Sequence, residues 1–279
     1  MKLGELMKIP FMKMSGSGND FILIDHREPL LKEDRLKDFI RKVCRRRISV
    51  GADGLILIER SQKADFKWRF YNSDGSEAEM CGNGGRCAAR FAYLKGIAGP
   101  SLKFETLAGI LSAQVDGKKV KLEMTKPFGL KLDETIFVDG EKQTFSSINT
   151  GVPHAVLFVE DLKGLDIVPV GRAIRFHSNF APSGTNVNFI LLEKGSQLSI
   201  RTYERGVEDE TLACGTGAVA SALVAAFKGL VKSPVSIKTK GGEVLKVYFE
   251  IQAREVKRVF FEGDVHIVYE AEMWEEAYQ

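Results

Sequence analysis

The sequence predicts an α+β protein built from two related halves. Three observations lead to this fold class. Short strand-like runs recur along the 279 residues, helices are few, and one Cys-Gly motif occurs twice with its surroundings. The steady alternation of strands and helices that a doubly wound parallel sheet requires does not appear. We therefore expect two pseudo-symmetric domains, each a mixed β-sheet or barrel wrapped around a central helix.

The predicted strands are rich in β-branched and aromatic residues or alternate between apolar and polar ones, as half-buried strands require. In the first half we expect strands at residues 21–25, 55–59, 68–71, 102–106 and 120–124. In the second half we expect them at residues 154–159, 187–192, 197–203, 235–239, 244–251, 256–262 and 265–270.

Three helices are predicted. Residues 32–47 form a charged amphipathic helix, whose cations from Arg41 to Arg47 fit a solvated face. The other two helices follow Gly-rich turns after Cys81 and Cys214. The helix after Cys214 is apolar nearly all round, so we expect it to be enclosed by sheet on every side.

The run Lys-Pro-Phe-Gly at residues 126–129 is typical of a connector between domains. We expect one domain over residues 1–125, completed by a last strand at about residues 267–279. The other domain then spans residues 126–266.

Composition and charge exclude several classes of protein. Lys and Arg number 40 against 37 Asp and Glu, and a net charge of +3 gives no reason to expect nucleic acid or an anionic membrane as partner. The longest nearly apolar run, residues 218–227, has about half of the ~20 residues needed to span a bilayer. Residues 1–14 lack the apolar core of a secretory signal, and four Cys make no disulfide framework. We therefore expect a cytoplasmic protein.

The repeated motif is the most informative feature of the chain. Residues 77–84 read Glu-Ala-Glu-Met-Cys-Gly-Asn-Gly, and residues 210–217 read Glu-Thr-Leu-Ala-Cys-Gly-Thr-Gly. The two copies lie 133 residues apart. This offset persists without a gap, since Lys95-Gly96 matches Lys228-Gly229 and Thr106 matches Thr239. In each copy a Cys-Gly-x-Gly turn opens a helix that ends at Lys-Gly, and a strand follows. Two homologous domains imply a cleft of pseudo-twofold symmetry between them, where we expect the active site.

A thiol in the first turn of a helix lies where backbone N–H groups and the helix dipole favour negative charge. The neighbouring glycines let a ligand approach that anion-binding backbone. Two such turns facing one cleft suit the inversion of a carbon that carries hydrogen, carboxylate and ammonium. One thiolate takes the proton from one face and one thiol returns a proton to the other, while the helix N-termini stabilise the charge that builds on the carboxylate.

Other interpretations of the cysteines are weaker. Cys44 and Cys87 fit small buried apolar residues. Five residues separate Cys81 from Cys87, with neither a Cys-x-x-Cys pair nor a His pair nearby, so we expect no metal site. The glycines after Cys81 do not give the G-x-G-x-x-G spacing of a dinucleotide site.

Further motifs occur in one order along the chain, at residues 17–21, 51–54, 70–76, 80–87, 151–154, 184–186, 203–206 and 213–217. Together they resemble the diaminopimelate epimerases, a family of amino acid epimerases that work without a cofactor. The resemblance implies an enzyme that interconverts L,L- and meso-2,6-diaminopimelate without pyridoxal phosphate or metal, for lysine and peptidoglycan supply. It also implies a homodimer.

The resemblance assigns roles to particular residues. It implies that Cys81 and Cys214 are the catalytic acid and base. It implies that the reacting carboxylate is bound by backbone N–H groups of Gly82, Asn83, Gly215 and Thr216. It implies that the distal amino-acid group is bound by Asn19, Asn72, Asn186, Glu204 and Arg205. It also implies that His154, together with Glu204, tunes the pKa values of the two thiols.

Two positions depart from some members of the family, which carry Gln and Asn where this chain has Gly54 and Val152. Neither residue can donate from its side chain, and we do not count them as site residues. Three other functions stay open: a proline or hydroxyproline racemase, a thiol redox or zinc-binding protein, and a non-catalytic amino-acid-binding module. Glu204 and Arg205 argue against the first, because proline has no distal amino-acid group.

Overall fold

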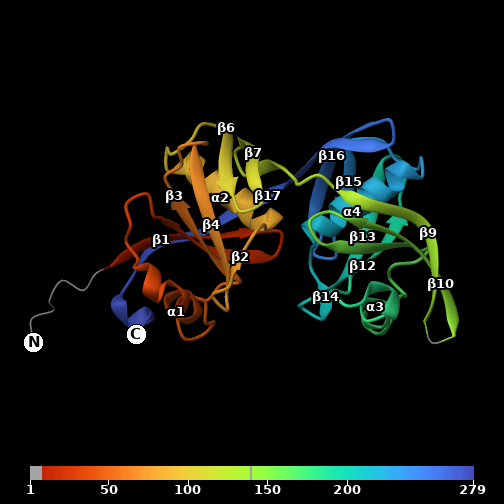
Figure 1. The fold of residues 1–279 in the computed structure, drawn as a ribbon, viewed down its shortest axis with the longest axis horizontal. Coiled ribbons are helices and arrows are strands. Elements are labelled where there is room, and N and C mark those ends of the chain that lie inside the picture. Colours follow the sequence, from red (N-terminus) through yellow and green to blue (C-terminus); the bar gives the residue numbers. More distant parts are fainter. Residues whose placement is uncertain (1–7, 139) are drawn as a thin grey trace, which may run out of the picture. The chain divides into compact units, whose positions relative to one another are not determined.

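The computed structural model describes residues 8–138 and 140–279; residues 1–7, part of the first predicted domain, lie outside the described residues. The chain divides into two compact units. Unit 1 comprises Met1–Leu122 and Asp264–Gln279, and unit 2 comprises Glu123–Gly263. Both units combine strands with helices, which confirms the α+β class (Figure 1).

The elements of unit 1 follow the chain from β1 to β8. They are β1 (Ile9–Gly16), β2 (Asn19–Asp25), α1 (Glu33–Val43), β3 (Gly54–Glu59), β4 (Phe66–Asn72), β5 (Glu77–Ala78), α2 (Gly82–Leu94), β6 (Ser101–Thr106), β7 (Gly109–Asp116) and β8 (Lys119–Glu123). The chain returns to this unit in the last part of β17 (Glu255–Met273) and the short 3₁₀ helix η2 (Glu275–Ala277).

The elements of unit 2 run from β9 to the first part of β17. They are β9 (Phe128–Val138), β10 (Glu141–Asn149), β11 (Pro153–Phe158), α3 (Ile167–Arg175), η1 (Ser178–Phe180), β12 (Asn186–Leu192), β13 (Gln197–Glu204), β14 (Asp209–Thr211), α4 (Gly215–Phe227), β15 (Val235–Lys238) and β16 (Val244–Gln252).

The same pairing scheme occurs in both units. In unit 1, β1 and β2 are antiparallel, β2 and β3 parallel, β3 and β4 antiparallel, and β4 pairs with β6 in parallel before the antiparallel β6–β7–β8 run. In unit 2, β10, β11, β12, β13, β15, β16 and β17 repeat these directions in the same order. The duplication read from the sequence is therefore a duplication of the fold.

The two units differ in the strand that pairs with the outer edge of the first strand of the shared scheme. Strand β10, the counterpart of β1 in unit 2, pairs on its other side with β9, whereas β1 pairs there with the C-terminal part of β17. Because β17 also pairs with β8, the strands of unit 1 close into a ring.

Each unit is organised around its repeated helix. Helix α2 packs against β1, β2, β3 and β7, and α4 packs against β10, β11, β12, β13, β15 and β16. From Ala218 to Ala225, α4 is buried on every side, as its nearly all-apolar sequence predicts. Burial of each large apolar side chain in such a core contributes ~1.5–3 kcal/mol to folding.

The structure corrects several predicted elements. The strands predicted at 256–262 and 265–270 are one continuous strand, β17, and the predicted helix 32–47 ends at Val43. Strands β1, β5, β7, β9, β10 and β14 and helix α3 were not predicted.

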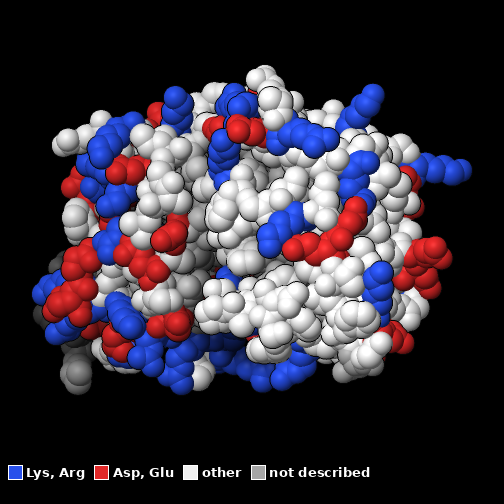
Figure 2. All heavy atoms as spheres, turned by 45° about the vertical axis from the view of Figure 1, so that its right-hand side comes forward, with Lys and Arg blue, Asp and Glu red and all other residues white. Residues whose placement is uncertain are grey.

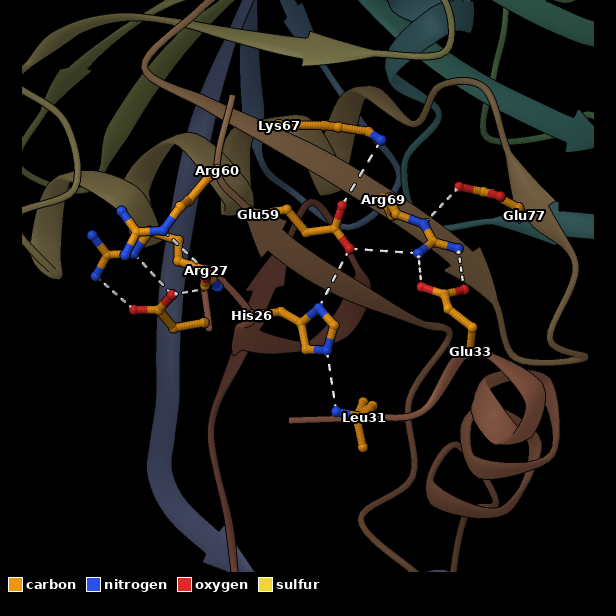
Figure 3. Close-up of polar contacts among 10 residues, drawn as sticks. His26, Arg27, Leu31, Glu33, Glu59, Arg60, Lys67, Arg69 and Glu77 are labelled. Atoms are coloured by element: carbon orange, nitrogen blue, oxygen red, sulfur yellow. Dashed lines mark hydrogen bonds and ion pairs between the residues drawn. The ribbon is translucent and has the colours of Figure 1, made fainter. Parts of the chain in front are cut away.

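A network of charged side chains ties α1 to the sheet of unit 1 (Figure 3). Glu59 on β3 contacts His26, Lys67 and Arg69, and Arg69 in turn pairs with Glu33 of α1. Leu31 donates its backbone N–H to His26 Nε2 at 3.2 Å, which secures the loop before α1. Elsewhere the face drawn in Figure 2 mixes cations and anions, with cations gathered along its lower edge.

Candidate functional site

The first repeated turn places Cys81 directly before α2. Cys81 has extended backbone (φ −145°) and caps the helix, since its Sγ accepts from the backbone N–H of Gly84 at 3.4 Å. The thiol therefore sits among the backbone N–H groups of the first turn, an arrangement that stabilises negative charge on sulfur.

The predicted residues Asn19 and Asn83 form a directed chain of hydrogen bonds beside this turn. Arg86 is fully buried and donates to Asn83 Oδ1 at 2.8 Å. Asn83 then donates to Asn19 Oδ1 at 2.8 Å, and Asn19 donates to Asp53 Oδ2 at 2.9 Å. A guanidinium at one end and a carboxylate at the other fix the orientation of both amides.

The carboxylate end of this chain is itself anchored. Asp53 accepts from Arg46 at 2.7 Å, and Arg46 also pairs with Asp20. The buried ammonium of Lys13 lies 2.9 Å from Asp20. These two cations hold the pKa of Asp20 below its usual value against the opposing effect of burial, which is the largest single influence on it.

Asn72 lies at the end of β4, where it is exposed and donates to Ser76 Oγ at 3.1 Å. Its partner across the ladder is Gly54. A Cβ on Gly54 would lie 2.5 Å from the carbonyl oxygen of Tyr71 and 2.7 Å from the Phe70 ring, so packing leaves no space for a side chain there.

The second repeated turn places Cys214 directly before α4. Its backbone is also extended (φ −123°), but its side chain does not cap the helix as that of Cys81 does, and its sulfur lies 3.5 Å from Thr216 Oγ1. Cys214 is 7% exposed, and Thr150 holds the turn by donating to the carbonyl of Thr216.

The predicted residue His154 is buried on β11 of the same unit. Asn188 Nδ2 lies 3.1 Å from its Nδ1. Burial, with a smaller contribution from the positive charge of Arg205, lowers the pKa of His154 to about 3, so the imidazole is neutral.

Asn186, Glu204 and Arg205 come together at the adjoining ends of β12 and β13. Asn186 Oδ1 accepts from the backbone N–H of Arg205 at 2.8 Å, and its Nδ2 donates to the carbonyl of Pro153 at 3.2 Å. The guanidinium of Arg205 donates to the carbonyl of Ser183 at 3.0 Å. In unit 1 the structure thus brings Asn19 and Asn83 together, and in unit 2 it brings Asn186 and Arg205 together.

The remaining cysteines differ from these two. Cys44 and Cys87 are buried, and burial raises the pKa of each thiol to about 12. They are small core residues, as expected. Among the described residues no group of His, Cys, Asp and Glu could hold a metal ion. Within the same residues, no helix is long and apolar enough to cross a membrane.

Sequence reasoning missed three residues of these clusters: Asp53, Arg86 and Asn188. The 133-residue offset places Arg86 opposite Val219 and Asn188 opposite Leu55, so the repeat drew attention to neither. Asp53 and Arg86 lie inside the motifs at residues 51–54 and 80–87, which is the signal that could have found them.

Comparison with solved structures identifies the fold that this chain shares with known proteins. The fold is that of a PhzF-family protein from Bacillus anthracis (TM-score 0.73, 17% identity, 96% of this chain and 99% of that one). It is also the fold of a hydroxyproline epimerase from Agrobacterium vitis (TM-score 0.69, 17% identity, 96% and 93%). The chain is thus an α+β protein of two units that shares its fold with these proteins.

Sequence comparison then defines the family. The family model described as diaminopimelate epimerase matches residues 11–128 and 146–267. A diaminopimelate epimerase of Aquifex aeolicus is 52% identical over 277 residues, covering 95% of this chain and 98% of that protein. One of Hydrogenobaculum is 49% identical, covering 92% and 96%. The chain belongs to the diaminopimelate epimerase family.

Proposed function

We propose that this chain interconverts L,L- and meso-2,6-diaminopimelate, with Cys81 and Cys214 as the acid–base pair, in lysine and peptidoglycan precursor synthesis. The observation that carries the proposal is the pair of thiols, each immediately before the same helix of a duplicated unit. Membership in the epimerase family supports the substrate.

In the proposed reaction, one cysteine acts as thiolate and removes the α-hydrogen as a proton. The electron pair remains on the α-carbon and its carboxylate, and the other cysteine donates its S–H proton to the opposite face. The first sulfur ends as thiol and the second as thiolate, so the same pair then serves the reverse direction.

The difficult step is the build-up of charge next to an existing carboxylate. We assign its stabilisation to backbone N–H groups of Gly82, Asn83, Gly215 and Thr216, in the first turns of α2 and α4. Donors held at helix N-termini need no reorganisation as the charge develops. The proposed chemistry therefore requires neither pyridoxal phosphate nor a metal.

The distal amino-acid group distinguishes this substrate from proline. We assign its carboxylate to the planar guanidinium of Arg205 and its ammonium to Glu204. Asn19, Asn72 and Asn186 supply both donors and acceptors to the remaining polar atoms. We assign the tuning of the thiol pKa values to Glu204 and the neutral His154.

We further propose that the enzyme is a cytoplasmic homodimer that uses the outer part of β17. Residues 266–270 of this strand are exposed in succession, including Ile267 (42%), Val268 (55%) and Tyr269 (40%). A strand normally buries alternate side chains, so apolar residues exposed on both faces favour cover by a second copy. Val268→Asp is expected to shift the mass measured by sedimentation from dimer to monomer, whereas Val244→Asp on β16, equally exposed at 55%, should not.

Incubation of L,L-diaminopimelate with the protein in deuterated water tests the activity. We expect the meso form to appear with deuterium at the inverted α-carbon. A binding module would give neither product nor exchange, and a proline racemase would invert proline instead. A thiol redox protein would consume a disulfide substrate while leaving diaminopimelate unchanged.

A further inference from the structure

A buried hydrogen-bonded group joins strands β11, β12 and β13 of unit 2. At its centre is Asn188, whose side chain is fully buried, next to the equally buried His154. Asn188 Nδ2 lies 3.1 Å from His154 Nδ1 and 3.0 Å from the carbonyl oxygen of Ala155. Thr202 donates its hydroxyl to Asn188 Oδ1 at 3.1 Å.

These contacts fix the orientation of the Asn188 amide. The carbonyl oxygen of Ala155 can only accept, so the amide atom facing it must be the NH₂ group. The same NH₂ group faces His154 Nδ1, and its two hydrogens serve these two acceptors. Nδ1 therefore carries no proton, because an N–H on the ring would point at another donor.

The tautomer of His154 follows directly. With Nδ1 accepting, the neutral ring carries its proton on Nε2. His154 Nε2 is buried and has no hydrogen-bond partner within residues 8–138 and 140–279. A buried donor without a partner costs free energy, so its retention favours a role in the site.

Asn188 also touches the turn that carries Cys214. A Cβ on Gly217 would lie 2.3 Å from Asn188 Oδ1 and 3.2 Å from Cys214 Sγ. The amide that orients His154 is thus packed against the first turn of α4, next to the thiol.

We propose that Asn188 is a positioning residue, which holds His154 as the neutral Nε2–H tautomer so that the imidazole offers a hydrogen-bond donor to the reaction centre. The inference rests on the proposed function, since it assigns His154 to the site of Cys214. The donor would stabilise anionic sulfur or carboxylate without adding a positive charge.

Imidazole ¹⁵N spectra of the protein test the tautomer without any substrate. The chain has four His, so single substitutions of His26, His177 and His266 assign the signals. We expect Nδ1 of His154 to appear as the unprotonated nitrogen. In Asn188→Asp, a carboxylate replaces the donor, and we expect the proton on Nδ1. A protonated Nδ1 in the unaltered protein, or an unchanged tautomer in Asn188→Asp, would overturn the proposal.

Kinetics test the connection to catalysis. We expect Asn188→Asp to lower kcat for diaminopimelate at least about 10-fold with a smaller change in KM, because the residue does not touch the substrate. In a His154→Phe background the same substitution should change kcat less than about 2-fold. An undiminished effect in that background would mean that Asn188 acts independently of His154, against the proposal.

Thr202→Val is the matched control. It removes the third hydrogen bond of the same amide, leaves Nδ2 facing His154, and perturbs the same buried position. We expect a lower Tm with the tautomer and kcat retained. An effect of Thr202→Val on kcat as large as that of Asn188→Asp would indicate general disruption and overturn the positioning role. If the spectra agree and diaminopimelate is not converted by the unaltered protein, the proposed function fails while the tautomer assignment holds.

Discussion

The side chains of Asn188 and Cys214 both border the position that a side chain on Gly217 would occupy. A methyl group at this glycine would lie 2.3 Å from the amide oxygen of Asn188 and 3.2 Å from the sulfur of Cys214. Gly84 is the equivalent position of the first repeat. A methyl group there would have Ile56 Cδ1, at 3.3 Å, as its nearest neighbour. The two repeats therefore tolerate side chains differently at one position of the same turn.

Gly217→Ala is expected to destabilise the protein by ~1–3 kcal/mol, the usual cost of overpacking a filled core. It should also lower turnover, because Asn188 must move. Gly84→Ala is the control: the end of a flexible side chain can yield, and Ala favours helix over Gly by up to ~1 kcal/mol. Chemical denaturation of both variants measures the difference, and equal losses would contradict this account.

Cys81→Ala and Cys214→Ala are each expected to lower turnover of diaminopimelate by at least ~10²-fold, because each thiol serves one face of the α-carbon. Cys87→Ala removes a buried thiol from the same helix as Cys81 and should keep turnover near that of the unaltered protein. Rates of L,L-to-meso conversion by chromatography provide the comparison. Near-normal turnover in either of the first two variants would exclude the two-thiol mechanism.

Asp53→Asn should raise KM for diaminopimelate by roughly 10-fold or more. Loss of the carboxylate frees the amide of Asn19 to turn, and hydrogen bonds to charged groups contribute about 1.5–3 kcal/mol. Asp25→Asn, at the other end of β2, breaks an ion pair with Arg27 away from the amide chain and serves as control. Steady-state kinetics of both variants give the test, and equal KM values would refute the ordering role of Asp53.

Arg205→Met should raise KM sharply and also lower kcat, because energy from binding the distal group helps to orient the reacting carbon. Arg254→Met, an exposed arginine in a turn of the same unit, should leave both constants unchanged. The assignment fails if Arg205→Met retains the kinetics of the unaltered protein, or if that protein racemises proline as well as it epimerises diaminopimelate.

Glu59→Gln should reduce the loss in the free energy of unfolding that occurs as the pH becomes acidic. The hydrogen bond from His26 is the largest influence on Glu59, and with nearby cations it holds the pKa of this carboxyl below 4.5 in the folded state. Its contribution to stability is therefore present above the unfolded pKa of about 4.5 and is lost as pH falls through the lower folded value. Glu28→Gln, an exposed carboxylate paired with Arg60, is the control. Urea denaturation between about pH 3 and 7 should show a flatter curve for Glu59→Gln alone.

Two of the missed elements, β9 and α3, lack a regular apolar pattern for physical reasons. Strand β9 is exposed along most of its length, so no alternation marks it. Helix α3 contains Pro169 and Gly171, which normally interrupt helices. Pro169 lies in the first turn, where no N–H is needed, and Gly171 allows close approach to Tyr203, whose Cβ would lie 2.5 Å from an added Cβ.

The candidate site was predictable where a motif is repeated or matches the family, which covers both cysteines and the residues beside them. Asn188 was not, because its importance comes from three strands that meet in space. Its partners His154 and Thr202 lie on other strands, and Asn188 itself falls just outside the motif at residues 184–186.

Strand β17 begins in unit 2 and ends in unit 1. It therefore sets the order in which the two units can complete their folding during synthesis. Synthesis runs from the N-terminus, so β1 and its neighbour β2 are made early, yet the second partner of β1 is residues 265–273. Unit 2 ends at Gly263 and is complete before that partner appears. The unit made first is thus closed last, and until then the nascent chain carries β1 with one edge unpaired, the state in which strands are most open to misassembly and to chaperones.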